Sequence, residues 1–485
     1  MVKGKSLTKN SIYYVVYNTL NILFPFLTGI YVSQVLFPND IGTIRYAQNI
    51  AQYFVILSFL GIPTYGMREI SKARDNRLEV NRIFSELYII NFISTVIFVL
   101  CYCILIFSIP QFRENIIIYL IVGGSIALNV FNISFLYDGL EEFKFTSLRN
   151  ISFKAIVFIL LLLMVKEPTD YLWYAAITVF GTAGNYIINM LHSKRFVTFS
   201  YQSLNFKRHI KPIMLLVAVN LAIEIYSLVD VTMIGNICSK DHVAFYSYGH
   251  NIQRILLQVI NSFTIVIVPR ITFYYKEGKI ENFNMLLTKT LYVIMVLSSA
   301  MILGLFFTAD KFIVLLYGNS YTNSSKVLLI LSVLLLISPI GYLLGSRVLL
   351  AVGKENLMAV CVAIGAIVNV ITNWFLIPKY AEFGAAYASV VSEFIVMSIY
   401  IWFGKRYFHL THLFIEIRKI IIALTVMCIT LYILTKFHMP VVIELVLDVV
   451  LASGIYFALL LVQKETIVIE YFTKMKAKIM RTKNL

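Results

Sequence analysis

Two long apolar segments, NLAIEIYSLVDVTMIG at residues 220–235 and HVAFYSYGHNIQRILLQVINSFTIVIVP at residues 242–269, decide the fold of this chain. The short polar turn between them predicts a helical hairpin over residues 212–268, with both helices long enough to cross a bilayer. An ionisable group at the centre of an inserted helix costs about 2.5–3.5 kcal/mol, so such groups face a cavity or a partner. We therefore expect the hairpin to line a transport pathway, because it carries four of them: Glu224, Asp230, His250 and Arg254.

The composition is that of a membrane protein with many transmembrane segments. Of the 485 residues, 59% are hydrophobic and only 14% are charged, and the mean hydropathy is +0.82. These values are too apolar for a soluble globular protein, and the absence of period-two alternation excludes barrel strands. Apolar runs of about 20 residues predict an all-α fold of fourteen transmembrane helices. We place them at residues 11–31, 41–64, 83–109, 116–137, 151–165, 171–191, 212–235, 243–268, 285–307, 325–346, 357–377, 385–403, 420–435 and 441–462.

Positive charge follows the alternation that this helix count requires. In the fourteen-helix topology, 32 of the 41 Lys and Arg residues fall on the side of the N-terminus and seven on the opposite side. The remaining two, Arg45 and Arg254, lie within helices. Because cytoplasmic loops concentrate Lys and Arg, we expect both termini in the cytoplasm. The net charge of +16 is then explained by topology and by contact with anionic lipid, so we expect no nucleic-acid partner.

A weak internal repeat divides the predicted helices into two lobes. At an offset of 202 residues, IGTIRYAQNIAQ at residues 41–52 aligns with VAFYSYGHNIQR at residues 243–254. Both segments begin even-numbered helices entered from the same side, as a repeated six-helix unit requires. We predict an N-terminal six-helix lobe, a C-terminal six-helix lobe related to it by pseudo-twofold symmetry, and two further helices with a basic cytoplasmic tail, at residues 1–205, 206–410 and 411–485.

Polar side chains recur on one face of two predicted helices. The second helix carries Arg45, Gln48, Asn49 and Gln52, and the eighth carries Ser247, His250, Asn251, Arg254, Gln258 and Asn261. Such faces cannot meet lipid tails, so they form either interhelical hydrogen bonds or the wall of a water-filled lumen. We favour the lumen, with these substrate-binding residues: Arg45, Asn49, Gln52, His250, Asn251, Arg254 and Gln258.

The charged residues near mid-membrane allow two interpretations. At 1.5 Å per residue, Glu224 and Arg254 lie roughly 18 Å and roughly 17 Å from the ends of adjacent antiparallel helices. One interpretation is a structural ion pair between them. In the other, Arg254 binds an anionic substrate while Glu224, Asp230 or Glu393 exchanges a coupling ion, H⁺ or Na⁺. Arg45 has its own alternative, which is to extend toward the lipid headgroups.

Motifs for catalysis and cofactor binding are absent from the sequence. Gly353-Lys354-Glu355 lacks the Ser or Thr and the leading glycine of a nucleotide-binding loop, and there is no HExxH, EF-hand loop or nucleophile elbow. The five cysteines have neither metal nor redox spacing. We therefore expect a protein that is not an enzyme and that has no cofactor or metal. The first apolar run has full span length and lacks a cleavage site, so we expect no cleaved signal peptide.

Five segments share patterns of Gly, Pro and aromatic residues with a known family. They are FPFLTGIYVSQVLFPNDIGTIRYAQNIAQYF, GIPTYGMREISKARDN, YDGLEEFKFTSLRNISFK, DVTMIGNI and VIVPRIT, which begin at residues 24, 61, 137, 230 and 266. These segments resemble bacterial polysaccharide flippases, the O-antigen, capsule and related repeat-unit translocases of the multidrug/oligosaccharidyl-lipid/polysaccharide exporter superfamily. The resemblance extends over essentially the whole chain, including the fourteen helices and the two six-helix lobes.

This resemblance implies a transport function. The chain would move an undecaprenyl-diphosphate-linked oligosaccharide repeat unit from the inner to the outer leaflet of the bacterial cytoplasmic membrane by alternating access. It would keep a cationic lumen for the diphosphate, which Arg45 and Arg254 fit, and would be coupled to an ion gradient or the membrane potential. Implied partners are the lipid-linked oligosaccharide, membrane lipids, and the polymerase and glycosyltransferases of the same pathway.

Three alternatives to this function stay open. A peptidoglycan-precursor flippase is the closest variant and is separable only by its substrate. A multidrug cation antiporter of the same superfamily would need an acidic lumen, whereas the first predicted helix, residues 11–31, contains no Asp or Glu. A non-transporting scaffold or a lipid scramblase of envelope assembly belongs to a different class. Loss of a specific glycan without loss of Arg-dependent flipping in vesicles would support this alternative.

Overall fold

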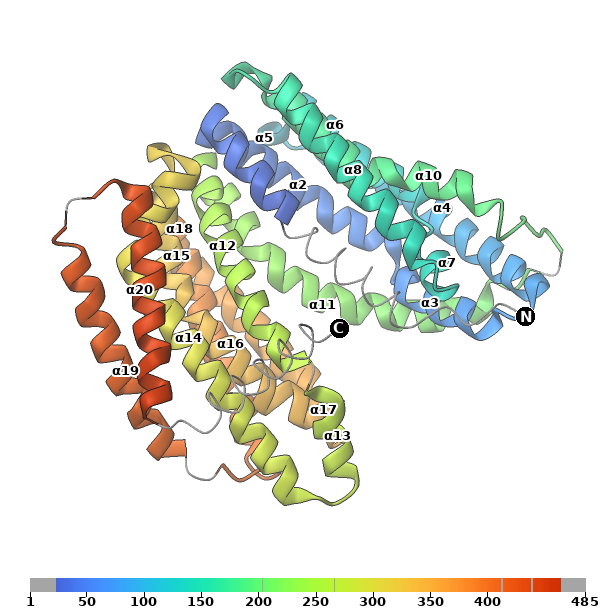
Figure 1. Ribbon diagram of the computed structural model, residues 1–485. Helices are drawn as coiled ribbons and strands as arrows, with labels where there is room; N and C mark the ends of the chain where they lie inside the picture. The colour runs from blue at the N-terminus through green and yellow to red at the C-terminus, as the bar shows by residue number, and fades with distance from the viewer. Residues whose placement is uncertain (1–22, 203, 266, 411–412, 438, 464–485) are drawn as a thin grey trace, which may run out of the picture. The chain divides into compact units, whose positions relative to one another are not determined.

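The computed structural model consists of helices, with no strand among the residues that it describes (Figure 1). These are residues 23–202, 204–265, 267–410, 413–437 and 439–463, without the side chains at 215, 218–227, 265, 268, 355 and 413–416. Within these ranges, ten helices are long and apolar enough to cross a membrane, which agrees with the predicted all-α membrane fold. The chain forms two compact units, Met1–Ala244 and Phe245–Leu485.

The N-terminal unit begins, in its described part, with a short apolar helix at Leu23–Val35. The helices that follow are α2 (Pro38–Phe59), α3 (Ile62–Ala73), α4 (Arg77–Ser108), α5 (Pro110–Arg113), α6 (Ile116–Leu128), α7 (Ser134–Gly139), α8 (Phe143–Met164), α9 (Tyr171–Val179), α10 (Asn185–Ser193) and α11 (Lys207–Ile237). Between α9 and α10 the chain makes one π-helical turn, η3 (Phe180–Gly184). The predicted sixth span at residues 171–191 is therefore a helix interrupted by a π turn.

The second predicted span ends earlier than expected, because the chain breaks between α2 and α3. Leu60 and Gly61 both adopt positive φ, 50° and 68°. Only glycine adopts this conformation without strain, and a Cβ added at Gly61 would lie 2.9 Å from the Cβ of Leu216 on α11. Gly61 therefore permits both the turn and the close approach of α11.

The segment that joins α10 to α11, described at residues 194–202 and 204–206, is held along the start of α4; we call it the connector. Asn81 bonds Thr198 twice, through its Nδ2 to the threonine Oγ1 at 2.9 Å and through its Oδ1 to the threonine N–H at 3.0 Å. The N–H of Ser200 donates to Ser85 Oγ at 2.8 Å. These bonds satisfy backbone groups that lack a helical partner, and they fix the entry of the chain into α11.

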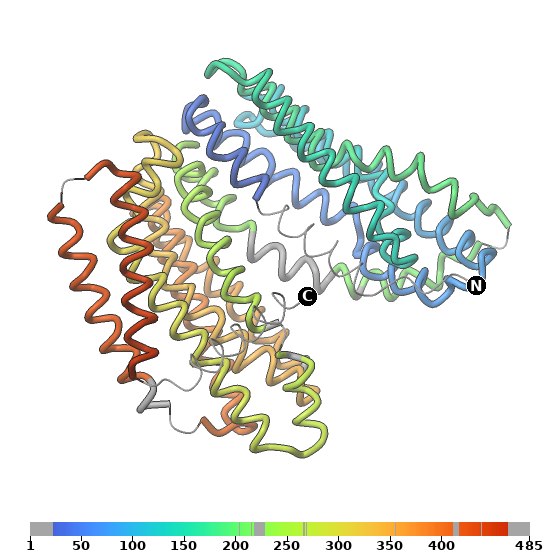
Figure 2. The backbone as a smooth tube through the Cα atoms, viewed as in Figure 1, coloured from blue at the N-terminus to red at the C-terminus, as the bar shows by residue number. Residues whose placement is uncertain are grey.

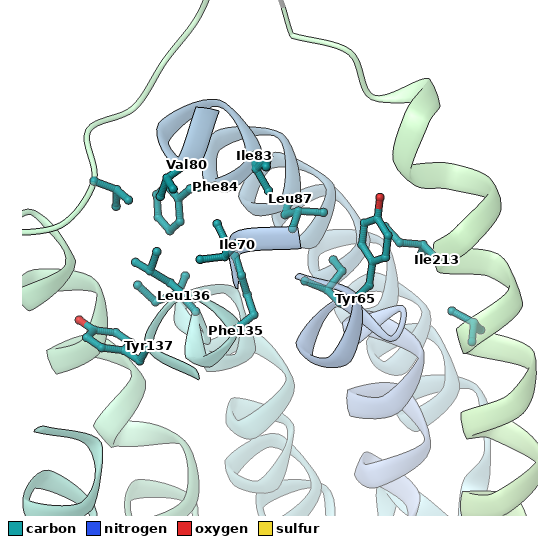
Figure 3. Close-up of a cluster of buried hydrophobic side chains, with 14 residues drawn as sticks. Tyr65, Ile70, Val80, Ile83, Phe84, Leu87, Phe135, Leu136, Tyr137 and Ile213 are labelled. Carbon is teal, nitrogen blue, oxygen red and sulfur yellow. The ribbon is translucent and has the colours of Figure 1, made fainter. Parts of the chain in front are cut away.

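An apolar core lies where α3, α4, α7 and α11 meet at one end of this unit (Figure 3). Phe84, Leu87 and Phe135 are almost fully buried in it, and Ile213 of α11 extends the cluster. Each such side chain contributes about 1.5–3 kcal/mol through burial. The core therefore anchors the start of α11 to the N-terminal helices.

The C-terminal unit contains most of α12 (Lys240–Ile265) and the helices after it. These are α13 (Val268–Lys276), α14 (Ile280–Tyr317), α15 (Asn323–Ser332), α16 (Leu334–Gly341), α17 (Val348–Ala351), α18 (Glu355–Gly404), α19 (Leu413–Leu434) and α20 (Val441–Val462). A second π turn, η5 (Tyr342–Arg347), joins α16 to α17. Figure 2 shows α19 and α20 as an antiparallel pair, and both contact α14.

Two predicted spans, at residues 357–377 and 385–403, form one long element with a kink. Ala381 has φ 48° and ψ −125° inside α18, and Pro378 lies just before it. Proline removes a backbone donor, which explains why the helix bends there. The two spans were predicted as separate helices, and the kink is their boundary.

The outer surfaces of the helices are apolar, as lipid contact requires. Helix α4 exposes Ile93, Ile97, Leu100, Ile104 and Phe107, at helical spacing along one side. A soluble monomer rarely exposes so long an apolar stripe. The chain is a multi-pass membrane protein.

The two compact units do not divide at the boundary expected between the lobes. Helix α11 packs with the N-terminal unit, so the units divide after Ala244, whereas the lobes were placed at residues 1–205 and 206–410. The compact units are defined by how residues pack, whereas the lobes were predicted from a sequence repeat, so the one division does not test the other. The lobes, their pseudo-twofold relation and the added segment at 411–485 stay predictions.

Candidate functional site

A cavity of about 400 Å³ lies within the N-terminal unit. Its wall is formed by the helix at Leu23–Val35 and by α2, α6, α8, α9 and the π turn η3. A volume of this size falls within the range of small-molecule sites, roughly 300–1,000 Å³. The polar part of its lining includes Arg45, Gln48, Gln52, Asn129, Lys154 and Thr178.

Among the described residues that line this cavity, two are cations and none is Asp or Glu. Arg45 comes from α2 and Lys154 from α8, and both side chains are half-buried. Because two like charges at one site reinforce each other's attraction for an anion, the cavity favours an anionic group. Arginine presents several donors in a planar fork that matches phosphate, and lysine adds a compact charge. A phosphate ester is therefore the anion that this pair suits best.

Hydrogen bonds hold the amides at the cavity wall. Gln48 donates from Nε2 to Thr178 Oγ1 at 3.1 Å, which links α2 to α9. Asn129 donates from Nδ2 to Ser58 Oγ at 2.8 Å, while its buried Oδ1 accepts no bond from any described residue. A buried polar atom without a partner is costly. Asn129 thus offers one acceptor close to the cavity.

The π turn η3 contributes backbone to the wall. Gly181, Thr182 and Ala183 all line the cavity. A Cβ added at Gly181 would lie 2.7 Å from Val157 Cγ2, so α8 approaches the turn closely there. π turns are rare in proteins as a whole, but those that occur are often found at functional sites. The position of η3 therefore supports assigning a function to this wall.

The second-helix stripe divides between the cavity and α11. Arg45, Gln48 and Gln52 line the cavity as expected. Asn49 is buried elsewhere, and its Nδ2 donates to the carbonyl of Leu228 at 3.2 Å and to Thr232 Oγ1 at 2.7 Å. Asn49 therefore links two helices of this unit, and its role as a substrate ligand stays a prediction.

The eighth-helix residues lie in the C-terminal unit, on α12. Arg254 and Gln258 are exposed, and Asn251 is half-buried. The ring of His250 stacks on Tyr246, with centroids 5.5 Å apart. An exposed guanidinium in a membrane helix requires a polar surrounding, so this face of α12 agrees with a wetted lumen. Substrate binding by these four residues stays a prediction.

The three residues proposed for ion coupling belong to different helices. Asp230 is buried on α11, with 6% of its surface exposed. Glu393 is half-buried on α18 and accepts a bond from the hydroxyl of Ser338 on α16 at 3.1 Å. The side chain of Glu224 lies outside the described residues, and so does the proposed Glu224–Arg254 ion pair. Coupling by any of the three stays a prediction.

Lys154 is the cavity residue that sequence reasoning missed. The charge count assigned it to the loop before the fifth span, although the predicted bounds of that span, residues 151–165, include it. Helix α8, however, begins at Phe143, so Lys154 lies eleven residues, or about 16 Å, along the helix. The available signal was a lysine four positions after Asn150, inside the otherwise apolar run ISFKAIVFILLLLM.

Two family profiles match this chain. One, described as "Polysaccharide biosynthesis protein", covers residues 7–274, and the other, described as "Lipid II flippase MurJ", covers residues 142–451. Each covers more than half of the chain. A protein named "Putative O-antigen transporter" from Escherichia coli (strain K12) is 23% identical over 407 residues, which are 83% of this chain and 97% of that protein.

Solved structures share the fold. One described as "Lipid II flippase MurJ, inward closed conformation" has a TM-score of 0.74 at 15% identity, over 93% of this chain and 98% of the other. A multidrug resistance MATE family transporter of the MOP superfamily, in an inward-facing conformation, has a TM-score of 0.66 at 12% identity, over 79% of this chain and 93% of the other. At these identities the likeness concerns the fold.

Proposed function

Because the chain belongs to the polysaccharide flippases of the multidrug/oligosaccharidyl-lipid/polysaccharide exporter superfamily, we propose that it moves an undecaprenyl-diphosphate-linked oligosaccharide repeat unit from the inner to the outer leaflet. The movement proceeds by alternating access in the bacterial cytoplasmic membrane, with both termini in the cytoplasm. The product serves the synthesis of a surface polysaccharide. The polymerase and glycosyltransferases of the same pathway are its partners.

The charge of the cavity carries this proposal. The described part of its lining contains Arg45 and Lys154 but no Asp or Glu. A diphosphate that leaves water loses strong hydration, and fixed cations replace it with charge-assisted hydrogen bonds. At about 400 Å³ the cavity suits the diphosphate and the adjoining sugar rather than a whole oligosaccharide. The prenyl tail stays in the bilayer, against apolar surfaces such as the exposed stripe of α4.

The second group of polar residues acts later on the path of the cargo. Arg254, His250, Asn251 and Gln258 of α12 provide a further cationic and amide surface. Asp230, Glu393 and Glu224 are the candidates for exchange of H⁺ or Na⁺. In this scheme the side chain of Arg254 contacts the diphosphate, and the carboxylates bind the H⁺ or Na⁺ that drives transport. Separate residues therefore bind the cargo and the coupling ion.

The rival function is export of organic cations, which the fold shared with a multidrug transporter supports. A cationic substrate requires carboxylates or aromatic faces in its site. The described lining of the cavity in the N-terminal unit includes the aromatic residues Phe24, Tyr174 and Tyr186, but it also carries the two positive charges of Arg45 and Lys154, which repel such a substrate. The anionic cargo is therefore the better fit.

The test combines depletion in cells with a reconstituted assay. Depletion should accumulate a lipid-linked glycan whose head group is accessible only from the cytoplasmic side. In vesicles, Arg45→Ala and Lys154→Ala should each slow transfer of that glycan about 30-fold, because one lost contact to a charged group is worth about 2 kcal/mol.

The matched control is Lys166→Ala, which removes an exposed lysine just beyond the end of α8. This variant should transfer the glycan at the wild-type rate. Normal transfer by both cavity variants at equal membrane abundance would exclude the cavity as the binding site. Export of organic cations without any change in lipid-linked glycan would favour the rival function.

A further inference from the structure

Three charged residues meet between α14 and α20, far in sequence from the residues assigned to transport. Lys311 lies near the end of α14, and Glu444 and Asp448 lie one turn apart on the same side of α20. The ammonium of Lys311 is 2.5 Å from Glu444 Oε1 and 3.6 Å from Asp448 Oδ2. The three side chains therefore form one cluster.

The two carboxylates of this cluster are not equivalent. Glu444 holds the ammonium of Lys311 in a direct, charge-assisted hydrogen bond. The 3.6 Å separation to Asp448 is too long for a hydrogen bond. Asp448 is 2% exposed, and neither of its oxygens bonds to any residue that the structure describes. Asp448 is thus a buried carboxyl group without a hydrogen-bond donor.

The other charged groups on the packed helices face elsewhere. Asp310 of α14 accepts from the hydroxyl of Ser325 on α15. Beyond α19, the ammonium of Lys436 lies over the exposed ring of Tyr432, 4.9 Å from its centroid. Arg418 and Lys419 lie near the opposite end of α19. Among the described residues, Lys311 is therefore the cation available to Asp448.

The charge balance of the cluster requires one more positive charge. One ammonium neutralises one carboxylate, and the close contact assigns it to Glu444. A buried carboxylate that is ionised and has no hydrogen-bond donor costs several kcal/mol, and such a group becomes neutral instead. A metal ion is disfavoured because the ammonium already occupies the space between the two carboxyl groups. The missing charge is a proton.

We propose that Asp448 is a proton-binding site between α14 and α20. A carboxylate oxygen forms its O–H bond with a proton released by hydronium in the adjoining water, and the proton returns to water when the bond breaks. The side chain of Lys311, 26% exposed, connects the cluster to that water. The predicted topology places this end of α20 on the outer side of the membrane.

Proton binding changes how α20 is held. With Asp448 protonated, Lys311 bonds to Glu444 alone. With Asp448 ionised, the ammonium is shared by both carboxylates, which draws α20 toward α14. Farther along the same two helices, Tyr456 donates to the carbonyl of Val296 at 3.1 Å within an apolar cluster. The proton therefore tightens or loosens one end of the contact.

The test is an infrared titration of the purified full-length protein in detergent from about pH 4 to about pH 9, because carboxyl groups and histidines titrate within roughly this range. The wild type should show a protonated-carboxyl C=O band that disappears as pH rises, and Asp448→Asn should lack it. Glu444→Gln should move the midpoint of this band to lower pH by about one unit, because Lys311 then pairs with Asp448. Persistence of the same band in Asp448→Asn would overturn the proposal.

Two further outcomes would also overturn it. One is a wild-type protein without any such band over this range, which means that Asp448 is ionised throughout. The other is loss of the band when Na⁺ replaces choline at constant pH, which means that a metal ion occupies the site. Each measurement is made without cargo, so its result does not depend on the function proposed above.

Discussion

Replacement of Glu86 by glutamine should release the connector from α4. The carboxylate of Glu86 is fully buried, and it accepts bonds from Arg208 Nη2 at 2.5 Å, His209 Nε2 at 2.7 Å and the N–H of Asn205 at 2.5 Å. Nδ1 of His209 in turn lies 2.8 Å from the hydroxyl of Tyr65. These contacts tie the connector and the start of α11 to α3 and α4.

The size of the effect follows from burial. Removal of one partner from a buried ion pair costs about 3–5 kcal/mol. Arg208 is 32% exposed, so water solvates the released guanidinium and the lower limit of about 3 kcal/mol applies. This corresponds to a change of roughly 150-fold in the equilibrium for local opening. Amide hydrogen exchange in the described residues between 198 and 209 measures that equilibrium directly.

Glu79 provides the matched control on the same helix. It bonds the same Arg208, at 2.8 Å, but its side chain is 34% exposed. A partly exposed pair contributes about 0–1 kcal/mol, so Glu79→Gln should change the opening equilibrium less than about fivefold. Equal effects of the two substitutions would refute the reasoning, because burial would then not decide the strength of the contact.

Three further substitutions test contacts within single units. Asn49→Ala should lower the free energy of unfolding by about 1–3 kcal/mol, because it removes the two hydrogen bonds that Asn49 donates to α11, to the carbonyl of Leu228 and to Thr232 Oγ1; a denaturation midpoint equal to that of the wild type would contradict this. Ala381→Gly should raise the midpoint, since φ 48° with ψ −125° strains any residue with a Cβ by about 1–3 kcal/mol; a lower midpoint would show that the kink is not strained. Gly235→Ala should greatly reduce folded yield, because the new Cβ would lie 2.2 Å from the ring of Tyr46, and the smaller side chain in Gly235→Ala/Tyr46→Ala should restore it.

Much of the fold was predictable because it depends on local hydrophobicity. Apolar runs of span length identify membrane helices without knowledge of their partners. The kink at Ala381 and the π turn at Phe180–Gly184 were not predictable from these runs. Both depend on how neighbouring helices pack, and hydropathy does not contain that information.

The candidate site was predictable in part for a similar reason. Helical geometry places Arg45, Gln48, Asn49 and Gln52 along one side of α2. It does not say which neighbour each residue contacts. In the structure, Asn49 donates a hydrogen bond to α11, whereas the other three residues line the cavity. Lys154 was missed because the charge count treated it as a loop residue, although the predicted span at residues 151–165 contains it.

The π turn at Phe180–Gly184 bears on how this wall can change during evolution. A π turn holds one residue more than an α-helical turn, so it is equivalent to an insertion that the flanking turns have absorbed. Loss of one residue here would restore a regular helix and keep both flanks in phase, whereas the same loss inside α8 would rotate everything after it by about 100°. Deletion of one codon can therefore change the shape of the cavity at this position, while the helices on either side of the turn keep their orientation.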